Sequence, residues 1–202
     1  LRMSDRLTHE CGLAFVRLRK PLHYYQEQYG DAAWGLRKTY LLMQKQYNRG
    51  QDGAGLGVVK FDMPAGDPFL LRVRSDKHNA IERIFDAITE DTERLSNAIT
   101  AETELNAKQT CRFLGETYLG HLRYGTHSGN SMAMCHPFVR KSNIASRNIA
   151  LAGNFNMTNS NELFAKLVEY GLDPVGDNDT QVILEKISHF LNDEHEHNLR
   201  LT

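Results

Sequence analysis

The chain has 202 residues, 41% of them hydrophobic, which is enough to bury the core of one ordinary domain. Its 24 basic and 25 acidic residues give a formal net charge of -1 without a long block of one sign, which argues against nucleic-acid binding. No apolar run approaches the ~20 residues that a membrane helix requires, and the first ten residues lack the apolar segment of a signal peptide. The composition therefore predicts a cytoplasmic protein that binds neither nucleic acid nor membranes.

Apolar periodicity in the first half of the chain predicts strands, two of them joined as a hairpin, and separate helical segments. Gly50 follows the first predicted helix, and a turn containing Pro and Gly joins the second and third strands. The polar run ITEDTERLSNAITAETELNAK is expected to form a solvent-exposed helical face. The predicted elements are a strand over 11–18, a helix over 34–48, strands over 55–61 and 69–74, and a helical region over 79–110.

The second half predicts two strands that end in polar loops, followed by two amphipathic helices. Ser160 or Asn159 is expected to cap the first of these helices, and acidic residues favour the start of the second. The tail after residue 191 is expected to be solvated or frayed. The predicted elements are strands over 116–126 and 148–156 and helices over 161–171 and 179–191. Their order predicts an α+β fold rather than regular strand–helix alternation.

The three cysteines, Cys11, Cys111 and Cys135, lie at wide spacings that fit neither a disulfide framework nor a metal site. Cys11 opens the first predicted strand, whereas the other two are expected to be small buried hydrophobic residues. His9, His121 and His136 have no predicted partner and are expected to be structural or exposed.

Five polar motifs lie near the ends of these elements: Cys11-Gly12, NRGQD at 48–52, HLRYGTH at 121–127, GNFNMTN at 153–159 and NDT at 178–180. In this order and spacing they resemble the class II glutamine amidotransferases, the N-terminal-nucleophile (Ntn) hydrolases that release ammonia from glutamine. Within that family, NRGQDGAG and NFNMTN are most similar to the HRGQDSAG and NGNLTN of the amidophosphoribosyltransferase glutaminase domains, which serve purine synthesis.

The resemblance implies an Ntn-hydrolase-like four-layer αββα sandwich of two mainly antiparallel sheets. Residues 11–202 would form the amidotransferase domain, the N-terminal part of a longer protein. Residues 1–10 would be a propeptide or a remnant that precedes it.

Cys11 would be the nucleophile in such a domain. A free thiol is only a few per cent ionised at neutral pH, and in this family the α-amino group of the cysteine itself serves as its base. That role requires Cys11 to be the first residue of the mature chain, so the resemblance implies a cut after Glu10.

The remaining motif residues would bind the oxyanion and the substrate. Asn154 would donate its side-chain amide and Phe155 its backbone N–H to the oxyanion, while Gly50 would border the nucleophile. The guanidinium of Arg123 suits the α-carboxylate of glutamine, and the carboxylate of Asp179 suits its α-ammonium. The other members of the implied pocket are Arg49, an orienting cation, and Thr126 and His127, which would line it.

Two departures from the family pattern accompany this resemblance. The HNG of the family is replaced by Gly153-Asn154-Phe155, and its NA[HQ]P by residues 134–137, MCHP. A backbone N–H survives at Phe155 if the local backbone tolerates a side chain.

No metal or organic cofactor is implied. The expected partners are L-glutamine and an acceptor synthase or phosphoribosyltransferase domain, in cis or in trans, and the resemblance implies self-association. Two alternatives stay open: a catalytically silent module that binds glutamine, and a glutaminase domain that serves another acceptor such as an amino-sugar synthase.

Overall fold

The computed structural model describes residues 10–93, 98–125 and 131–200. Two compact units make up the chain, unit 1 from Leu1 to His136 and unit 2 from Pro137 to Thr202. Each unit has its own sheet.

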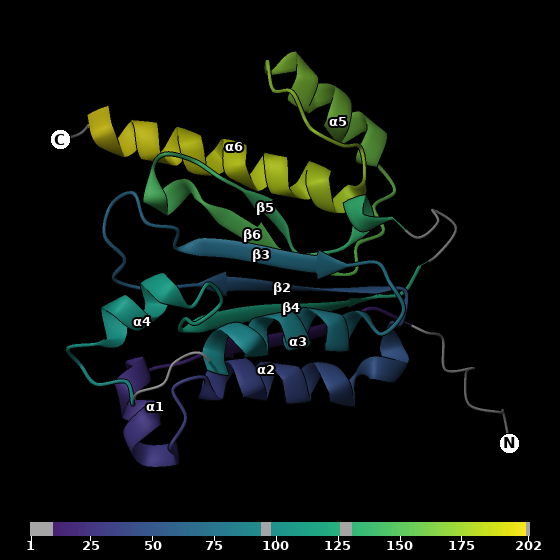
Figure 1. Cartoon of the computed structure of the whole chain (residues 1–202). Helices are drawn as coiled ribbons and strands as arrows, with labels where there is room; N and C mark the ends of the chain where they lie inside the picture. The colour runs from purple at the N-terminus through teal and green to yellow at the C-terminus, as the bar shows by residue number, and fades with distance from the viewer. Residues whose placement is uncertain (1–9, 94–97, 126–130, 201–202) are drawn as a thin grey trace, which may run out of the picture. The chain divides into compact units, whose positions relative to one another are not determined.

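Unit 1 is built around a four-stranded sheet in which every neighbouring pair of strands is antiparallel. In spatial order the strands are β1 (Gly12–Arg17), β4 (Thr117–Arg123), β2 (Gly53–Val59) and β3 (Leu70–Ser75). The helices of the unit are α1 (Leu22–Tyr29), α2 (Trp34–Lys45), α3 (Ala80–Glu93) and α4 (Glu104–Thr110). Helices α2 and α3 lie side by side over one face of the sheet (Figure 1).

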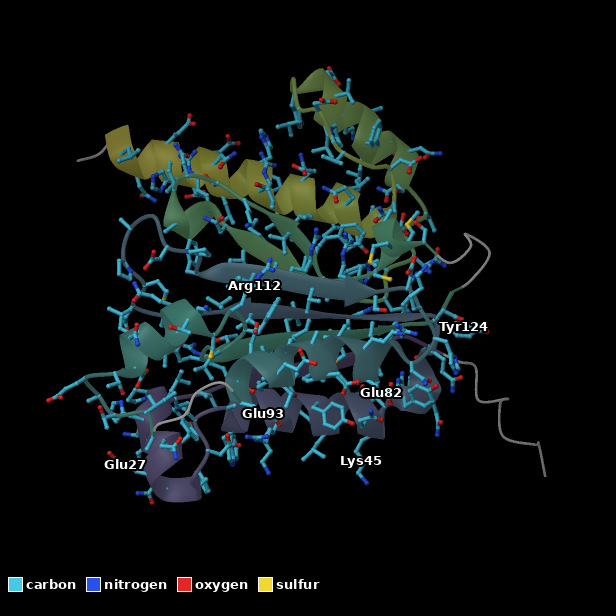
Figure 2. All side chains as sticks on the ribbon, viewed as in Figure 1. Glu27, Lys45, Glu82, Glu93, Arg112 and Tyr124 are labelled. Atoms are coloured by element: carbon cyan, nitrogen blue, oxygen red, sulfur yellow. The ribbon has the colours of Figure 1, made fainter. Side chains whose placement is uncertain are left out.

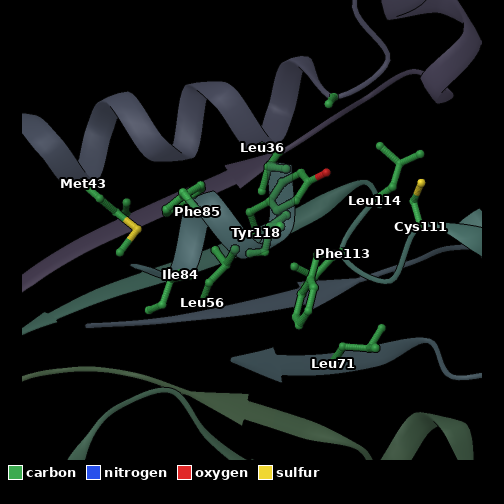
Figure 3. Packing of buried hydrophobic residues seen from close by; sticks show 14 of the residues in the cluster. Leu36, Met43, Leu56, Leu71, Ile84, Phe85, Cys111, Phe113, Leu114 and Tyr118 are labelled. Carbon is green, nitrogen blue, oxygen red and sulfur yellow. The ribbon is translucent and has the colours of Figure 1, made fainter. Parts of the chain in front are cut away.

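The core of unit 1 fills the space between these two helices and the sheet (Figure 3). Met43 of α2 and Ile84 of α3 are buried against Leu56 of β2 and Tyr118 of β4. Each such side chain contributes on the order of 1.5–3 kcal/mol when it leaves water. Strand β2 contributes apolar side chains to the helix-covered face only, because its apolar residues alternate with glycines. Gly53, Gly55 and Gly57 lie on the face away from the helices.

A buried ionic network lies at the end of the sheet where β1 finishes. Lys108 donates to Glu116 at 2.9 Å and lies 3.8 Å from Glu104, whose second oxygen is 2.6 Å from Nδ1 of His23. Lys60 is also buried and donates to the carbonyl oxygens of two residues near α4. The expectation of a solvent-exposed face over residues 88–108 is therefore wrong at Glu104 and Lys108, which are buried. Burial of these charged groups is tolerated because groups of opposite charge lie next to one another, which offsets the cost of removing them from water.

Unit 2 contains a two-stranded antiparallel sheet and two helices. Its elements are β5 (Phe138–Arg140), β6 (Ile149–Leu151), α5 (Ser160–Glu169) and α6 (Asp179–Arg200). Arg140 of β5 forms an ion pair with Glu185 of α6, which fastens the helix to the small sheet. The side chain of Asn178 caps α6 by accepting a hydrogen bond from the backbone N–H of Gln181 at 3.0 Å.

Most predicted elements are present, and the α+β prediction is confirmed. The sequence did not predict α1 or β5, and the helical region over 79–110 proves to be two helices. The predicted strand over 148–156 is shortened to β6, and α6 continues through most of the tail that was expected to be frayed. Among the described residues, no helix combines the length and apolar character needed to cross a bilayer.

Candidate active site

Three strand ends of unit 1 place the predicted residues together. Gly12 of β1 pairs with Leu122 of β4, and Gly53 of β2 pairs with Arg123. Cys11 immediately precedes β1, so it lies beside Arg123 at the same end of the sheet. Tyr124 marks this end in Figure 2, just beyond the last residue of β4.

Arg49 lies in the short helical turn that follows α2, and its side chain reaches the backbone of Cys11. Its guanidinium donates to the carboxylate of Glu10 at 2.9 Å and to the carbonyl oxygen of Cys11 at 3.4 Å. Cys11 itself is partly exposed and forms no disulfide. Arg49, the predicted orienting cation, therefore lies next to Cys11, the predicted nucleophile. Its guanidinium is paired with the carboxylate of Glu10, the residue before Cys11.

Gly50 and Asp52 fix the loop after Arg49 to the end of β4. A Cβ atom on Gly50 would lie 2.6 Å from the carbonyl carbon of Arg123, so no residue with a side chain fits there without a shift of backbone. The backbone N–H of Asp52 donates to the carbonyl oxygen of Arg123 at 3.0 Å. Its carboxylate accepts from the N–H of Gly125 at 2.7 Å. Asp52 thus fixes the backbone at Arg123 and just after it, where the sequence predicts the α-carboxylate site.

Two polar residues here had no predicted role, although the sequence offered a signal for one of them. Asp52 belongs to the NRGQD motif, and an Asp before glycine is a common backbone acceptor. Gln46 gave no such signal, because its partner is 33 residues away. Its side-chain amide accepts from the backbone N–H of Leu13 at 3.1 Å and donates to the carbonyl oxygen of Leu13 at 3.0 Å. Gln46 therefore pairs with β1 as a neighbouring strand would.

Arg123 is buried, with 6% of its surface exposed. Cys135 lies close enough for the positive charges of Arg123 and Arg74 to act on its thiol, although burial dominates and raises the pKa of Cys135. Cys135 and Cys111 are both buried and form no disulfide, as predicted for structural cysteines.

In unit 2 the loop that carries Asn154 contains the first of the two departures from the family pattern, Gly153-Asn154-Phe155. A Cβ atom on Gly153 would lie 2.6 Å from two ring carbons of Phe155, so the ring occupies the space of a side chain at position 153. Among the described non-glycine residues, only Asp62 and Asn79 have a positive φ. Phe155 therefore holds its position without left-handed backbone. In this arrangement the ring of Phe155 and a side chain at position 153 would compete for the same space.

Asp179 is fastened to the same loop. One oxygen of its carboxylate accepts a hydrogen bond from the backbone N–H of Met157 at 2.7 Å, while Asn178 provides the cap of α6. A position at the start of a helix also favours a negative charge. Within unit 2, Asp179 and the loop of Asn154 are thus brought together.

The structure gathers Cys11, Arg49, Gly50 and Arg123 in unit 1, and Asn154, Phe155 and Asp179 in unit 2. Thr126 and His127 lie outside the described residues, as do His9 and all but the last residue of the segment 1–10. No group of three or more metal-ligating side chains occurs in the ranges that the structure describes.

A separate cavity of about 750 Å³ lies at the other end of the unit 1 sheet. It is lined by none of the predicted site residues, and its walls include Arg17, Phe61, Glu104 and Glu116. Glu104 and Glu116 belong to the buried ionic network.

The fold is shared with a class of glutamine-dependent amidotransferases. A glutamine phosphoribosylpyrophosphate (PRPP) amidotransferase from B. subtilis, solved in complex with ADP and GMP, superposes with a TM-score of 0.55 at 19% identity. The superposition covers 87% of this chain and 28% of that chain. No protein-family model matches the chain.

Sequence comparison points to the same class of protein. Amidophosphoribosyltransferase 3 and amidophosphoribosyltransferase 2 of Arabidopsis thaliana, both chloroplastic, are 25% and 27% identical over 185 residues, which is 92% of this chain. The amidophosphoribosyltransferase of Methanocaldococcus jannaschii is 39% identical over 67 residues, 33% of the chain and 14% of the relative. The chain spans about a quarter of the length of the two Arabidopsis relatives, 27% and 26%. The chain is homologous to the glutamine amidotransferase region of the amidophosphoribosyltransferases, which confirms the resemblance of its motifs.

Proposed function

We propose that this chain hydrolyses the side-chain amide of glutamine to glutamate and ammonia through a thioester on Cys11. The observation that carries the proposal is the placement of a free, partly exposed cysteine at the start of β1, beside the buried guanidinium of Arg123 and below Arg49. A nucleophile, an anion-binding cation and an orienting cation are the groups that this reaction needs on one side of the substrate.

In the proposed reaction the sulfur of Cys11 attacks the carbonyl carbon of the side-chain amide, and the thiol proton passes to the α-amino group of Cys11. The oxyanion that forms is stabilised by the side-chain amide of Asn154 and the backbone N–H of Phe155, roles that rest on their position in the motif. Collapse of the intermediate transfers the proton to the departing nitrogen, so ammonia leaves and a thioester remains. Water then hydrolyses the thioester, which releases glutamate and restores the thiol.

The two charged ends of glutamine would be held by Arg123, which binds the α-carboxylate, and Asp179, which binds the α-ammonium. Gly50 allows the loop backbone to lie directly against the backbone of Arg123, because it has no side chain. Arg49 would orient the substrate with Thr126 and His127, both assigned from the motif alone.

The proposal includes the family's context for the reaction. The chain would adopt the four-layer αββα arrangement of an Ntn hydrolase, and its ammonia would pass to a phosphoribosyltransferase acceptor in cis or in trans, as the names of its relatives suggest. Self-association of the chain belongs to the same proposal.

The test compares glutamine hydrolysis by a chain that begins at Cys11 with hydrolysis by its Cys11→Ala variant. Release of glutamate and ammonia is measured, and a trapped thioester is sought as a mass increase on Cys11. Equal rates in the two proteins would show that Cys11 is not the nucleophile.

A second function is favoured by one contact. In the chain with Glu10 present, Arg49 is engaged by the Glu10 carboxylate, and the nitrogen of Cys11 is an amide without useful basicity. A protein that retains these residues would bind glutamine without hydrolysing it. Thermal stabilisation by glutamine in a chain that shows no turnover and no cut after Glu10 would support this module.

A further inference from the structure

His121 and His136, which the proposed reaction does not use, form a pair near Arg123. Nδ1 of His136 lies 3.0 Å from Nε2 of His121, and the rings meet edge to face with centroids 4.2 Å apart. His121 is buried, with 1% of its surface exposed. The separation of the two nitrogens is that of a hydrogen bond, in which one imidazole donates an N–H and the other accepts.

His121 and Arg123 lie on the same face of β4, because side chains alternate along a strand and the two residues are two positions apart. The same face of β2 carries Gly53 opposite Arg123 and Gly55 opposite His121. The pair therefore sits next to Arg123 on the face of the sheet that α2 and α3 do not cover.

The segment Cys135-His136 crosses these glycines at close range. A Cβ atom on Gly55 would lie 1.8 Å from the carbonyl oxygen of His136, and one on Gly53 would lie 2.7 Å from Sγ of Cys135. Only glycine permits this approach. The glycines of the NRGQDGAG motif thus provide the surface on which the segment rests.

Strand β3 holds the other side of the segment. Arg74 donates to the carbonyl oxygen of Cys135 at 2.8 Å, and Sγ of Cys135 lies 3.6 Å from the carbonyl oxygen of Ser75. The bond between His136 and His121 ties the same segment to β4, the strand that carries Arg123. Cys135 is also near enough to Arg123 for that charge to act on its thiol.

We propose that His121 and His136 are a positioning pair, which fixes the Cys135-His136 segment against β4 so that the guanidinium of Arg123 is held ready for the α-carboxylate of glutamine. This inference rests on the proposed function, because the role of Arg123 does. A hydrogen-bonded pair restricts the buried arginine more than apolar packing alone, and a preorganised cation binds its anion with less loss of conformational freedom.

The hydrogen bond itself is tested first, without any substrate. In protein with ¹⁵N-labelled histidine, an N–H···N bond gives a scalar coupling between the two ring nitrogens across it. The coupling is expected between His121 and His136 and absent in His121→Phe. A folded wild-type protein without this coupling would overturn the positioning pair.

The functional test measures KM and kcat for two amides with a chain that begins at Cys11. One is glutamine, and the other is a γ-carboxamide that lacks the α-carboxylate. We expect His121→Phe to raise KM for glutamine about tenfold with little change in kcat, and to leave the truncated amide unaffected. His136→Gln keeps a donor and an acceptor, so it is expected to retain most of the affinity for glutamine.

His23→Gln is the matched control, since it also removes an imidazole hydrogen bond, to Glu104 at the other end of the sheet. It is expected to leave KM unchanged. Equal losses for the two amides, or a normal KM for glutamine in His121→Phe, would overturn the proposal.

Failure of the proposed function would look different, because the wild-type chain would then hydrolyse neither amide. Glutamine affinity by calorimetry replaces KM in that case. Weaker binding to His121→Phe than to wild type would support the positioning pair, whereas equal binding, or no binding to either, would overturn it.

Discussion

The guanidinium of Arg49 bridges Glu10 and Cys11: it lies 2.9 Å from the carboxylate of the first and 3.4 Å from the carbonyl oxygen of the second. The side chains of Arg49 and Glu10 are both largely exposed to water, so their ion pair contributes little stability. In the proposed reaction Arg49 orients the substrate, and the Glu10 carboxylate would compete with the substrate for this guanidinium.

Removal of residues 1–10 is expected to activate the protein. A chain that begins at Cys11 has an amine of pKa about 8 in place of an amide, and a general base of this kind contributes roughly 10²–10⁴-fold to a rate. Glutamate release by the two forms measures the difference. The control is Glu10→Gln in the uncut chain, which removes the Glu10 charge that pairs with Arg49 but supplies no base, and it is expected to remain as slow as the parent. An uncut chain as active as the shortened one would contradict the prediction.

Only one of the three cysteines is expected to react with a chloroketone analogue of glutamine. Cys111 and Cys135 are buried, and burial raises the pKa of the Cys135 thiol, which keeps it protonated and unreactive at neutral pH. Intact mass and peptide mapping should therefore find one adduct, on Cys11. Excess glutamine should protect it, whereas labelling of all three thiols after unfolding provides the control. Native labelling of Cys135 at the rate of Cys11 would contradict the buried geometry.

Asp179 has two separable roles. Asp179→Asn retains an oxygen for the N–H of Met157 but loses the negative charge, whereas Asp179→Ala loses both. If the carboxylate binds the α-ammonium of glutamine, the Asn variant is expected to keep its thermal stability and lose about 1.5–3 kcal/mol of glutamine affinity. The Ala variant is expected to lose stability as well. Calorimetric titration and thermal unfolding separate the two effects, and an Asn variant with normal affinity would leave Asp179 a purely structural residue.

Gly153 and Phe155 are expected to be coupled in a double-mutant cycle. Gly153→Ala alone places a methyl group against the ring of Phe155, forces this exposed ring away from its position and should cost about 0.5–1.5 kcal/mol of unfolding free energy. In a Phe155→Gly background the same substitution should be nearly neutral. Urea unfolding of the four proteins measures the coupling free energy. Additive effects would show that the ring does not constrain position 153.

Glu104 is expected to make stability depend on pH in the acid range. Burial alone would raise the pKa of its carboxyl, but the hydrogen bonds from the backbone and ring of His23 and from the backbone of Leu22, with the charge of Lys108, together lower the pKa on folding. A lowered pKa contributes stability above the unfolded value, about 4.3, and that contribution is lost as the pH falls through the folded value.

Glu104→Gln should therefore be less stable than wild type by about 1–3 kcal/mol at neutral pH, with the difference shrinking below about pH 4. Glu162→Gln, which removes an exposed carboxylate paired with Lys166, is the control and should show no such pH-dependent loss. Chemical unfolding across this pH range checks both variants. A difference that stayed constant down to the lowest pH would contradict the role of the Glu104 charge.

Much of the fold could be predicted because the signals for it are local. The β2–β3 hairpin, the strand that leads to Arg123 and the helix α2 follow from periodicity and turn residues within a few positions. Helix α1 could not be predicted in the same way, since it is short, weakly amphipathic and begins after Pro21 without a capping side chain. Its place depends on burial of Leu22 and Tyr25 against residues distant in sequence.

The sequence by itself determined the order of the five motifs, and with it the resemblance to glutamine amidotransferases, because motif order is a property of the chain. Only the tertiary structure decided which polar groups meet. Gln46 binds β1, Arg49 binds Glu10, and His121 finds His136, although the sequence offered none of these residues a partner. Such pairs depend on strand register and on the close approach allowed by Gly53 and Gly55, and register is set by packing of the whole sheet rather than by any short segment.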